Sequence, residues 1–394
     1  MLRSLTLTNW KSFGEGDGAR NEVKFGALTV FVGPNGSGKS NVLDALRFLK
    51  GLAIGLRFFD ALRGRQEGGT QTWPGIRGAE TEAIRLETHG LRIEGAVDAE
   101  NTVVSFRTSL DRGAGLYASE ERLVHRGQSY ERISPRGVDL MTGSSKVQSA
   151  LAWGGELPGS TDVGAESEAR LHPFALPGRL LRQAMFLEVM PSMTRAPAPI
   201  NAAHIGENGE HLAAMLNGLT NADQQVLVAW LSEFAAPRVV RLEFEEVKSV
   251  GDVYFLVVEK HGNAERRISA RSLSDGTLRF LGILTALMTV PEGSIVVLEE
   301  PDAGLHPTRV HLLAELLESI TAKRKIQVIA TTHSPTLLAN LSREAFANVV
   351  AFDRDRDTGW TVCSRVGDME HKDIILDAPD RDHLIATGWL ERAL

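Results

Sequence analysis

Eight consecutive residues, 33–40, constrain the fold more than any other part of this sequence. They fit the pattern G-x-x-x-x-G-K-[ST] at every fixed position. The apolar run Leu28–Val32 before them is typical of a buried strand, and Ser40–Leu46 after them is typical of the first turns of a helix. A strand, a glycine turn and a helix start together form an anion site, because backbone N–H groups and the positive end of the helix dipole converge there. The sequence therefore predicts a phosphate-binding loop in an α/β fold.

Two side chains of this loop have predicted roles. Lys39 is expected to reach the β- and γ-phosphates of a bound nucleotide, and the Ser40 hydroxyl to hold Mg²⁺. The alternative is a chance glycine loop, and the agreement between the pattern and its flanks argues against it. The residues expected to contact the nucleotide here are Gly33, Pro34, Asn35, Gly36, Ser37, Gly38, Lys39, Ser40 and Asn41.

Composition is ordinary for a soluble globular protein, with 43% hydrophobic and 24% charged residues in 394. Cys363 is the only cysteine, so no intramolecular disulfide can form, which suits a reducing compartment. Apolar runs stay shorter than the roughly 18 to 20 residues of a membrane span, and the N-terminus reads as a strand rather than a signal peptide. We therefore expect a cytoplasmic protein without a membrane partner. The net charge of −7 argues against a strongly basic nucleic-acid binder but leaves room for a local basic patch.

Hydrophobic periodicity gives a coarse secondary structure. From Leu273 onward, helices and strands alternate, which is typical of a parallel sheet. Residues 64–78 are Gly-rich and loop-like, and residues 368–394 have room for a pair of helices. The predicted strands are 2–8, 27–32, 81–87, 91–97, 102–110, 239–247 and 253–259, with weaker strand-like runs over 117–133. Helical spacing covers 166–190, 209–219 and 221–234, with a connector over 190–200.

A second apolar strand, 294–298, ends in two carboxylates, Glu299 and Glu300. A buried strand that delivers an acid to the Mg²⁺ shell is the second motif of phosphate-loop NTPases. Glu299 stands where Asp is usual, so its contact with the metal is expected through water. Glu300 is then the predicted general base for the attacking water. The alternative is a pair of solvated acids at a strand end.

Two further motifs follow the same logic. Ser274 and Gly276 open an apolar helix, and their N–H groups and the Ser274 hydroxyl form a second candidate anion site. An ordinary N-cap explains the same residues. His333 closes the apolar strand 326–330, where it can donate to a γ-phosphate oxygen or to the attacking water. A structural histidine at a strand end remains the alternative.

The order of these motifs resembles that of the ABC-type ATPases, more narrowly the RecF, SMC and OLD-like branch with its stand-alone bacterial ATPases. The resemblance implies a P-loop NTPase head with a mixed sheet, an antiparallel β lobe and a short helical insert. It also implies three parts: 1–110 and 238–394 as the two halves of the head, and 111–237 as accessory strands and insert. The residues that carry it are 9–13, 33–40, 273–279, 299–307 and 332–335.

The resemblance also implies a composite site, in which two heads enclose two ATP molecules. Ser274 and Gly276 would contact the γ-phosphate held by the opposite head, and His306 would lie at the dimer seam. Lys11 and Ser12 would touch the nucleotide from the N-terminal strand. Departures from the family pattern are Asp275 and Thr277 in the signature motif, and the lack of an identifiable Q-loop glutamine, since Gln66, Gln71 and Gln148 are poor candidates.

The leading functional hypothesis is a Mg²⁺-dependent ATPase that dimerises on ATP and drives DNA handling in repair or anti-phage defence. A regulatory ATPase for a separately encoded effector, such as a nuclease, is the alternative, and a transporter's nucleotide-binding subunit is less favoured. A solvated face of an acidic protein competes with the DNA interpretation. The candidate DNA-phosphate contacts are Arg112, Arg122, Arg126, Arg132 and Arg136.

Overall fold

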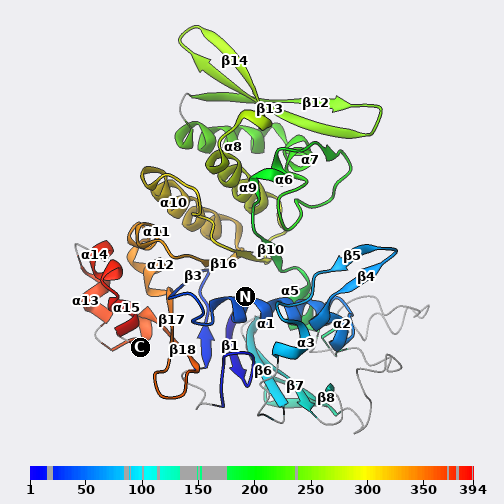
Figure 1. Cartoon of the computed structure of the whole chain (residues 1–394), viewed down its shortest axis with the longest axis vertical. Coiled ribbons are helices and arrows are strands. Elements are labelled where there is room, and N and C mark those ends of the chain that lie inside the picture. The colour runs from blue at the N-terminus through cyan, green and yellow to red at the C-terminus, as the bar shows by residue number, and fades with distance from the viewer. Residues whose placement is uncertain are drawn as a thin grey trace. The chain divides into compact units, whose positions relative to one another are not determined.

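The computed structural model groups the chain into two compact units (Figure 1). The first unit contains Met1–Ala184, Ala347–Ala378 and Thr387–Leu394, and the second contains Met185–Phe346 and Pro379–Ala386. The predicted segments 1–110, 111–237 and 238–394 divide the chain differently and remain a prediction. The structure describes residues 1–15, 21–83, 88, 90–99, 102–112, 116–133, 149, 151–152, 175–235, 238–370, 372–378, 381–392 and 394.

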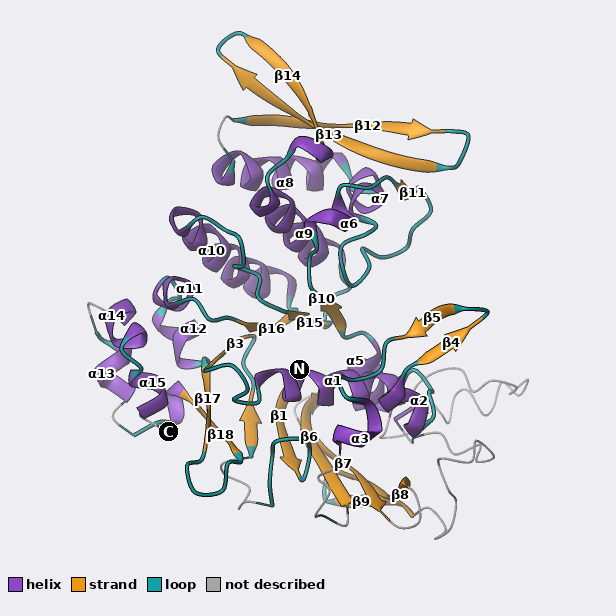
Figure 2. Ribbon diagram, viewed as in Figure 1, coloured by secondary structure: helices purple, strands orange, loops and turns teal. Residues whose placement is uncertain are grey.

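An antiparallel sheet forms one layer of the first unit (Figure 2). Its core face carries Leu5, Leu7, Ile93, Phe106 and Leu123, all buried, because alternate residues of a strand point to the same side. The antiparallel lobe is therefore confirmed. Its strands, in spatial order, are β2 (Glu22–Lys24), β1 (Leu2–Thr8), β6 (Gly90–Ala99), β7 (Thr102–Arg112), β8 (Leu116–His125) and β9 (Gln128–Ile133).

A mixed sheet in the same unit supports the phosphate loop. The fully buried β3 (Leu28–Val32) pairs in parallel with β17 (Val350–Arg354), which pairs antiparallel with β18 (Thr361–Arg365). Phe31 and Phe352 pack edge to face across β3 and β17, with ring centroids 5.0 Å apart. The predicted mixed sheet is thus confirmed, and β3 leads directly into residues 33–40.

The helices of the first unit begin with α1 (Lys39–Ala53) and α2 (Phe58–Arg63). The end of α1 is held by α5 (Ala175–Arg182), where Arg182 Nη2 donates to Ala53 O over 3.0 Å. Near the C-terminus lie α13 (Lys372–Leu376) and α15 (Trp389–Arg392), while α14 (Arg381–Ala386) belongs to the second unit. This terminal segment therefore holds three short helices instead of the predicted pair.

Three secondary-structure predictions in the first unit are wrong. Residues 81–83, expected in a strand, belong to α3 (Ala79–Ala83), whose Ala and Glu residues favour helix; residues 84–87 lie outside the described part. The Gly-rich loop contains a hairpin, β4 (Arg65–Glu67) and β5 (Thr70–Trp73), which turns at two glycines with positive φ. Of the helix predicted over 166–190, residues 166–174 lie outside the described part, α5 covers 175–182, and the chain then leaves the helix because β10 (Met185–Leu187) follows as a strand.

The second unit contains a parallel sheet of β10, β15 (Ile295–Leu298) and β16 (Gln327–Thr331). The helices α9 (Asp275–Thr289) and α10 (Pro307–Arg324) follow the predicted alternation with these strands. Both helices bury long apolar faces, and the Phe234 and Phe280 rings stack 4.1 Å apart. The short helical insert is confirmed by α6 (Pro191–Thr194), α7 (Leu212–Asn217) and α8 (Asn221–Phe234).

A second sheet of this unit is antiparallel, with β13 (Asp252–His261) between β11 (Ala198–Pro199) and β12 (Val239–Val247), and with β14 (Ala264–Ser269) also paired to β13. β14 was not predicted, because its polar run of Glu and Arg residues has no apolar alternation. The short helices α11 (Pro335–Ala339) and α12 (Arg343–Ala347) complete the description. Among the described residues, no helix is both long and apolar enough to cross a membrane.

Candidate nucleotide-binding site

Three glycines shape the loop between β3 and α1. Gly33, Gly36 and Gly38 have φ values of 147°, 78° and 115°, a region that L side chains rarely adopt. A Cβ on Gly33 would lie 2.2 Å from the Phe352 carbonyl oxygen, and one on Gly38 would lie 2.3 Å from Thr361 Oγ1. Both the backbone conformation and the close neighbours therefore require glycine at these two positions.

Several polar groups of the loop are placed to meet an anion. Within the part of the chain that the structure describes, the N–H groups of Gly38 and Ser40 have no hydrogen-bond acceptor, and the buried Ser37 Oγ has no partner. Lys39 Nζ donates to the carbonyl oxygens of Gly33 and Pro34, at 2.7 and 2.9 Å. Uncompensated donors at the start of a 15-residue helix, beside a buried ammonium, fit the oxygens of a phosphate.

Lys11 and Ser12 lie beside the first turns of α1, with their polar atoms bound to protein groups. Lys11 Nζ is 2.5 Å from Asp44 Oδ2 and donates to the Arg77 carbonyl oxygen over 2.6 Å. Ser12 Oγ accepts from Asn41 Nδ2 and lies 2.6 Å from Thr361 Oγ1. Their predicted contact with a nucleotide therefore remains a prediction, and these protein partners offer a structural role for both.

In the second unit, Glu299 and Glu300 directly follow β15, as expected for the second motif. The Glu299 N–H donates to the Leu187 carbonyl oxygen over 3.1 Å. Glu300 has φ 44°, unusual for a residue with a side chain, and its N–H donates to Thr331 Oγ1 over 3.1 Å. His333 Nε2 is 3.9 Å from Glu300 Oε1, and both side chains are exposed. The structure thus brings the predicted base and the predicted histidine together, in a conformation typical of functional sites.

Sequence reasoning missed Asp302. Its Oδ1 accepts from Thr332 Oγ1 over 2.9 Å, and burial raises the pKa of its carboxyl above the usual range. An acid in a turn after a strand is usually solvated, so nothing in the sequence distinguished it from its neighbours. Its position two residues after Glu300 was the available signal, and Asp302 joins the candidate site on geometry.

The start of α9 carries the signature motif. Ser274 is the N-cap, since its Oγ accepts from the Thr277 N–H over 3.1 Å, so the alternative assignment as a cap is correct as local structure. Arg195 Nη2 lies 2.5 Å from Asp275 Oδ1 and 3.1 Å from the Leu273 carbonyl oxygen. A Cβ on Gly276 would lie 3.1 Å from the Gly304 carbonyl oxygen, so the loop after β15 packs closely on the motif.

This motif opens onto a cavity of about 630 Å³ in the second unit. His306, the N-cap of α10, lies on its wall, so the predicted seam residue and the signature residues face the same hollow. The basic residues Arg266 and Arg309 also line it, together with the acidic residues Glu259 and Asp275. The cavity therefore offers hydroxyl, amide and basic groups to an anionic ligand.

Comparison with protein families identifies the chain. A family model described as "AAA domain, putative AbiEii toxin, Type IV TA system" matches residues 28–120 and 160–339, more than half of the chain. The chain belongs to this AAA-domain family. A second model, the P-loop containing region of AAA domain, matches residues 2–49. The predicted resemblance to P-loop ATPases is thereby confirmed, while the roles of individual residues remain predictions.

Curated relatives of this AAA-domain protein are much longer than the parts it matches. Chromosome partition protein Smc of Rhodopirellula baltica is 35% identical over 145 residues, which cover 36% of this chain and 11% of that protein. Smc of Mycolicibacterium paratuberculosis is 52% identical over 50 residues, 13% of this chain and 4% of that protein. The matched parts thus span about a tenth of these relatives, or less.

Solved structures of SMC heads are similar to this chain at low sequence identity. The SMC head domain from Thermotoga maritima matches with a TM-score of 0.47 and 16% identity, over 92% of this chain and 98% of that one. The SmcHead bound to the C-winged helix domain of ScpA matches with a TM-score of 0.48 and 16% identity, over 92% and 97%.

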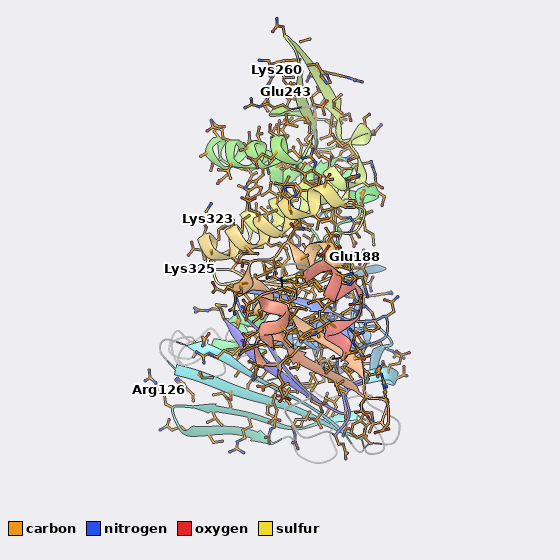
Figure 3. All side chains as sticks on the ribbon, turned by 90° about the vertical axis from the view of Figure 1, so that its left-hand side faces the viewer. Arg126, Glu188, Glu243, Lys260, Lys323 and Lys325 are labelled. Atoms are coloured by element: carbon orange, nitrogen blue, oxygen red, sulfur yellow. The ribbon has the colours of Figure 1, made fainter. Side chains whose placement is uncertain are left out.

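The arginines expected to contact DNA are spread over the antiparallel sheet of the first unit. Arg122 Nε donates to Ser129 Oγ over 3.0 Å. Arg126 is exposed in the turn between β8 and β9, and Figure 3 shows its side chain at the edge of this sheet. Arg112 and Arg132 lie in β7 and β9 with side chains outside the described part, as is the whole of Arg136.

Among the described residues, no group of three or more His, Cys, Asp or Glu side chains is placed to hold a metal ion. The predicted Mg²⁺ ligands, Ser40 and Glu299, do not form such a group by themselves, because magnesium sites in phosphate-loop proteins use few protein ligands and the substrate's phosphates. This pair remains a prediction.

Proposed function

We propose that this protein is a Mg²⁺-dependent ATPase that binds ATP on residues 33–40. The supporting observation is the loop itself, where, among the described residues, the N–H groups of Gly38 and Ser40 and the buried Ser37 Oγ have no partner, beside a buried Lys39 ammonium. These donors lie at the N-terminus of α1, where the helix dipole also favours negative charge. Membership of the AAA-domain family supports the same substrate.

Catalysis in this proposal is electrostatic, with no covalent intermediate. When ATP binds, the Lys39 ammonium donates to phosphate oxygens instead of the carbonyl oxygens of Gly33 and Pro34. Glu300 accepts a proton from the attacking water. His333, 3.9 Å from Glu300, donates to the same water or to a γ-phosphate oxygen. Ser40 and Glu299 would hold Mg²⁺, which neutralises phosphate charge when bound.

We further propose that two copies of the chain share each ATP. Ser274 and Gly276 would complete the γ-phosphate shell of the opposite copy, and His306 would lie at the seam. The cavity at the signature motif supports this arrangement because it collects hydroxyl, amide and basic groups in one place. ATP then stabilises only the closed pair, and hydrolysis releases it.

The test combines three variants. Lys39→Ala should abolish ATP binding, as measured by calorimetry. Glu300→Gln should retain ATP and form a dimer detectable by light scattering, since the base is lost while the phosphate contacts remain. Ser274→Arg should prevent that dimer and leave monomer binding nearly intact, whereas Val250→Arg, at an exposed turn, should leave it unchanged. A hydrolysis rate per chain that stays constant at all protein concentrations would refute the shared site.

The proposed output is DNA handling, in repair or anti-phage defence. The name of the Smc relatives, chromosome partition protein, supports a DNA-linked role, although the matched parts are short. The net charge of −7 weighs against it. Filter binding of DNA at several salt concentrations, with and without ATP, tests this proposal, and no retention in any condition would end it.

A regulatory ATPase acting on a separately encoded effector is the second candidate. The family description contains the words "putative AbiEii toxin, Type IV TA system", and a role within such a system favours a separate partner. Copurification of the product of a neighbouring gene, dependent on ATP and lost in Lys39→Ala, would support this candidate over direct DNA handling. A transporter subunit is less favoured, because the signature motif contains Asp275 and Thr277.

A further inference from the structure

The phosphate loop is tied to the β17–β18 hairpin by an ordered chain of hydrogen bonds. Asn41 Nδ2 donates to Ser12 Oγ over 2.6 Å, Ser12 Oγ lies 2.6 Å from Thr361 Oγ1, and Thr361 Oγ1 donates to the Ser37 carbonyl oxygen over 2.8 Å. The Thr361 N–H also donates to the Ser12 carbonyl oxygen over 2.9 Å. This series of hydrogen bonds therefore runs from Asn41 in the first turn of α1 through Ser12 and Thr361 and back to Ser37 in the phosphate loop.

The donor and acceptor in each of these hydrogen bonds follow from the number of protons on each side chain. A hydroxyl carries one proton, and Thr361 gives its own to the Ser37 carbonyl, so Thr361 must accept from Ser12. Ser12 in turn accepts from the Asn41 amide. Each hydroxyl thus donates once and accepts once, an arrangement in which successive hydrogen bonds polarise one another. The Thr361 side chain is fully buried, so water does not replace a lost member.

The hydrogen-bond series ends at the Ser37 carbonyl oxygen, and this position determines how it affects the nucleotide site. A trans peptide is planar, with C=O and N–H on opposite sides, so fixing the Ser37 carbonyl also fixes the Gly38 N–H. That N–H is one of the loop donors that have no acceptor among the described residues. Arg354, at the end of β17, holds the preceding peptide in the same way, since its Nε donates to the Gly36 carbonyl oxygen over 2.8 Å. The β17–β18 hairpin therefore fixes the carbonyl groups of Gly36 and Ser37 by hydrogen bonds from Arg354 and Thr361.

We propose that Thr361 is a positioning residue of the nucleotide site, which acts through the Ser37–Gly38 peptide to aim the Gly38 N–H at a phosphate. This inference rests on the proposed ATP binding at residues 33–40. It also gives Ser12 a different role from the predicted direct contact: Ser12 acts on the nucleotide through Thr361. Preorganisation of this kind improves affinity because binding no longer has to order the loop.

The test measures ADP binding by calorimetry, since ADP occupies the loop without hydrolysis. Thr361→Val keeps the β-branched shape and removes the hydroxyl, so the Kd for ADP should rise about five- to tenfold. Thr361→Ser keeps the hydroxyl and should bind ADP within about twofold of the unaltered chain. Ser12→Ala should weaken binding by itself but add nothing in the Thr361→Val background, because the chain is already broken.

Steady-state ATPase kinetics distinguish a positioning role of Thr361 from a merely structural one, because only a positioning role changes KM without changing kcat. Thr361→Val should raise KM and leave kcat nearly unchanged at temperatures where its circular dichroism equals that of the unaltered chain. If Thr361→Val does not fold, ADP binding by Ser12→Ala is compared with ADP binding by Ser12→Thr, which keeps a hydroxyl. This comparison tests the same series of hydrogen bonds at Ser12, the residue before Thr361.

Two results would overturn the inference alone: ADP binding by a folded Thr361→Val equal to that of the unaltered chain, or losses from Ser12→Ala and Thr361→Val that add fully. Additive losses would mean that Ser12 touches the nucleotide itself. Absence of ADP binding by the unaltered chain would instead overturn the proposed function, and this inference with it.

Discussion

The buried ion pair between Lys11 and Asp44 allows a quantitative test of what Lys11 does. Their side chains are only 7% and 4% exposed, and Lys11 Nζ also binds the Arg77 carbonyl oxygen. Replacing Lys11 with Met keeps the stem and removes the charge, which leaves the Asp44 carboxylate buried. Breaking a buried pair in this way typically costs about 3–5 kcal/mol.

The structure places the expected loss at the lower end of this range. Arg77 Nε lies 3.9 Å from Asp44 Oδ1, and its half-exposed side chain can compensate part of the uncovered charge. We therefore expect Lys11→Met to lower the free energy of unfolding by about 3 kcal/mol. In a folding unit of about 200 residues, this corresponds to a fall in Tm of roughly 6–12 °C. Thermal unfolding followed by circular dichroism measures it.

A matched control comes from the same unit. Lys24 pairs with Asp368 at 3.1 Å, but the two side chains are 46% and 31% exposed, so Lys24→Met should cost at most about 1 kcal/mol. Calorimetry with ADP below the unfolding transition completes the test, and Lys11→Met should bind as the unaltered chain does. Normal stability combined with weakened ADP binding would refute this reasoning and support direct contact between Lys11 and the nucleotide.

Three further predictions concern single sites. In the Glu300→Gln background, Arg195→Ala should weaken the ATP-dependent dimer severalfold, because the Asp275 charge beside the signature motif loses its partner. Adding Asp275→Gly should restore the dimer, and light scattering of the variants with and without Asp275→Gly measures this. Burial raises the pKa of the Asp302 carboxyl above its ordinary value of 3.8, so its stabilising contribution is present below that pH and is lost as pH rises through the folded pKa. Asp302→Asn should therefore gain stability relative to the unaltered chain as pH rises through this window, and parallel urea titrations with no such gain would contradict the burial argument. Gly38→Ala should lose more than about tenfold in ADP affinity, because its Cβ would lie 2.3 Å from Thr361 Oγ1 at φ 115°; unchanged calorimetric binding would show that the loop adapts.

Local patterns in the sequence predicted the parts of the site that are local. Residues 33–40 and their flanking strand and helix were predicted because the glycine spacing, the apolar run and the helix start occur within a few residues of each other. Likewise, Glu299 and Glu300 follow a predicted buried strand, and Ser274 opens a predicted helix. In each of these cases the backbone geometry depends mainly on neighbouring residues.

Contacts between distant segments could not be predicted in the same way. Thr361 lies in an unremarkable strand, and only the fold brings its hydroxyl to the Ser37 carbonyl. The pairing of Lys11 with Asp44 has the same origin, and the nucleotide contact that the family resemblance implied for Lys11 remains a prediction. β14 was missed because its polar residues are exposed and its strand conformation comes from pairing with β13.

The bond between Thr361 and Ser37 joins residues 324 positions apart in the chain. During translation at about 5–20 residues per second, roughly 15 to 65 seconds separate the appearance of the two partners at the ribosome. Until residues 350–365 emerge, the glycine-rich turn has neither β17 nor β18 against it. A polypeptide released early, before the hairpin is made, would present an unsupported turn to cellular nucleotide, so we expect the protein to gain its proposed nucleotide affinity only late in its synthesis.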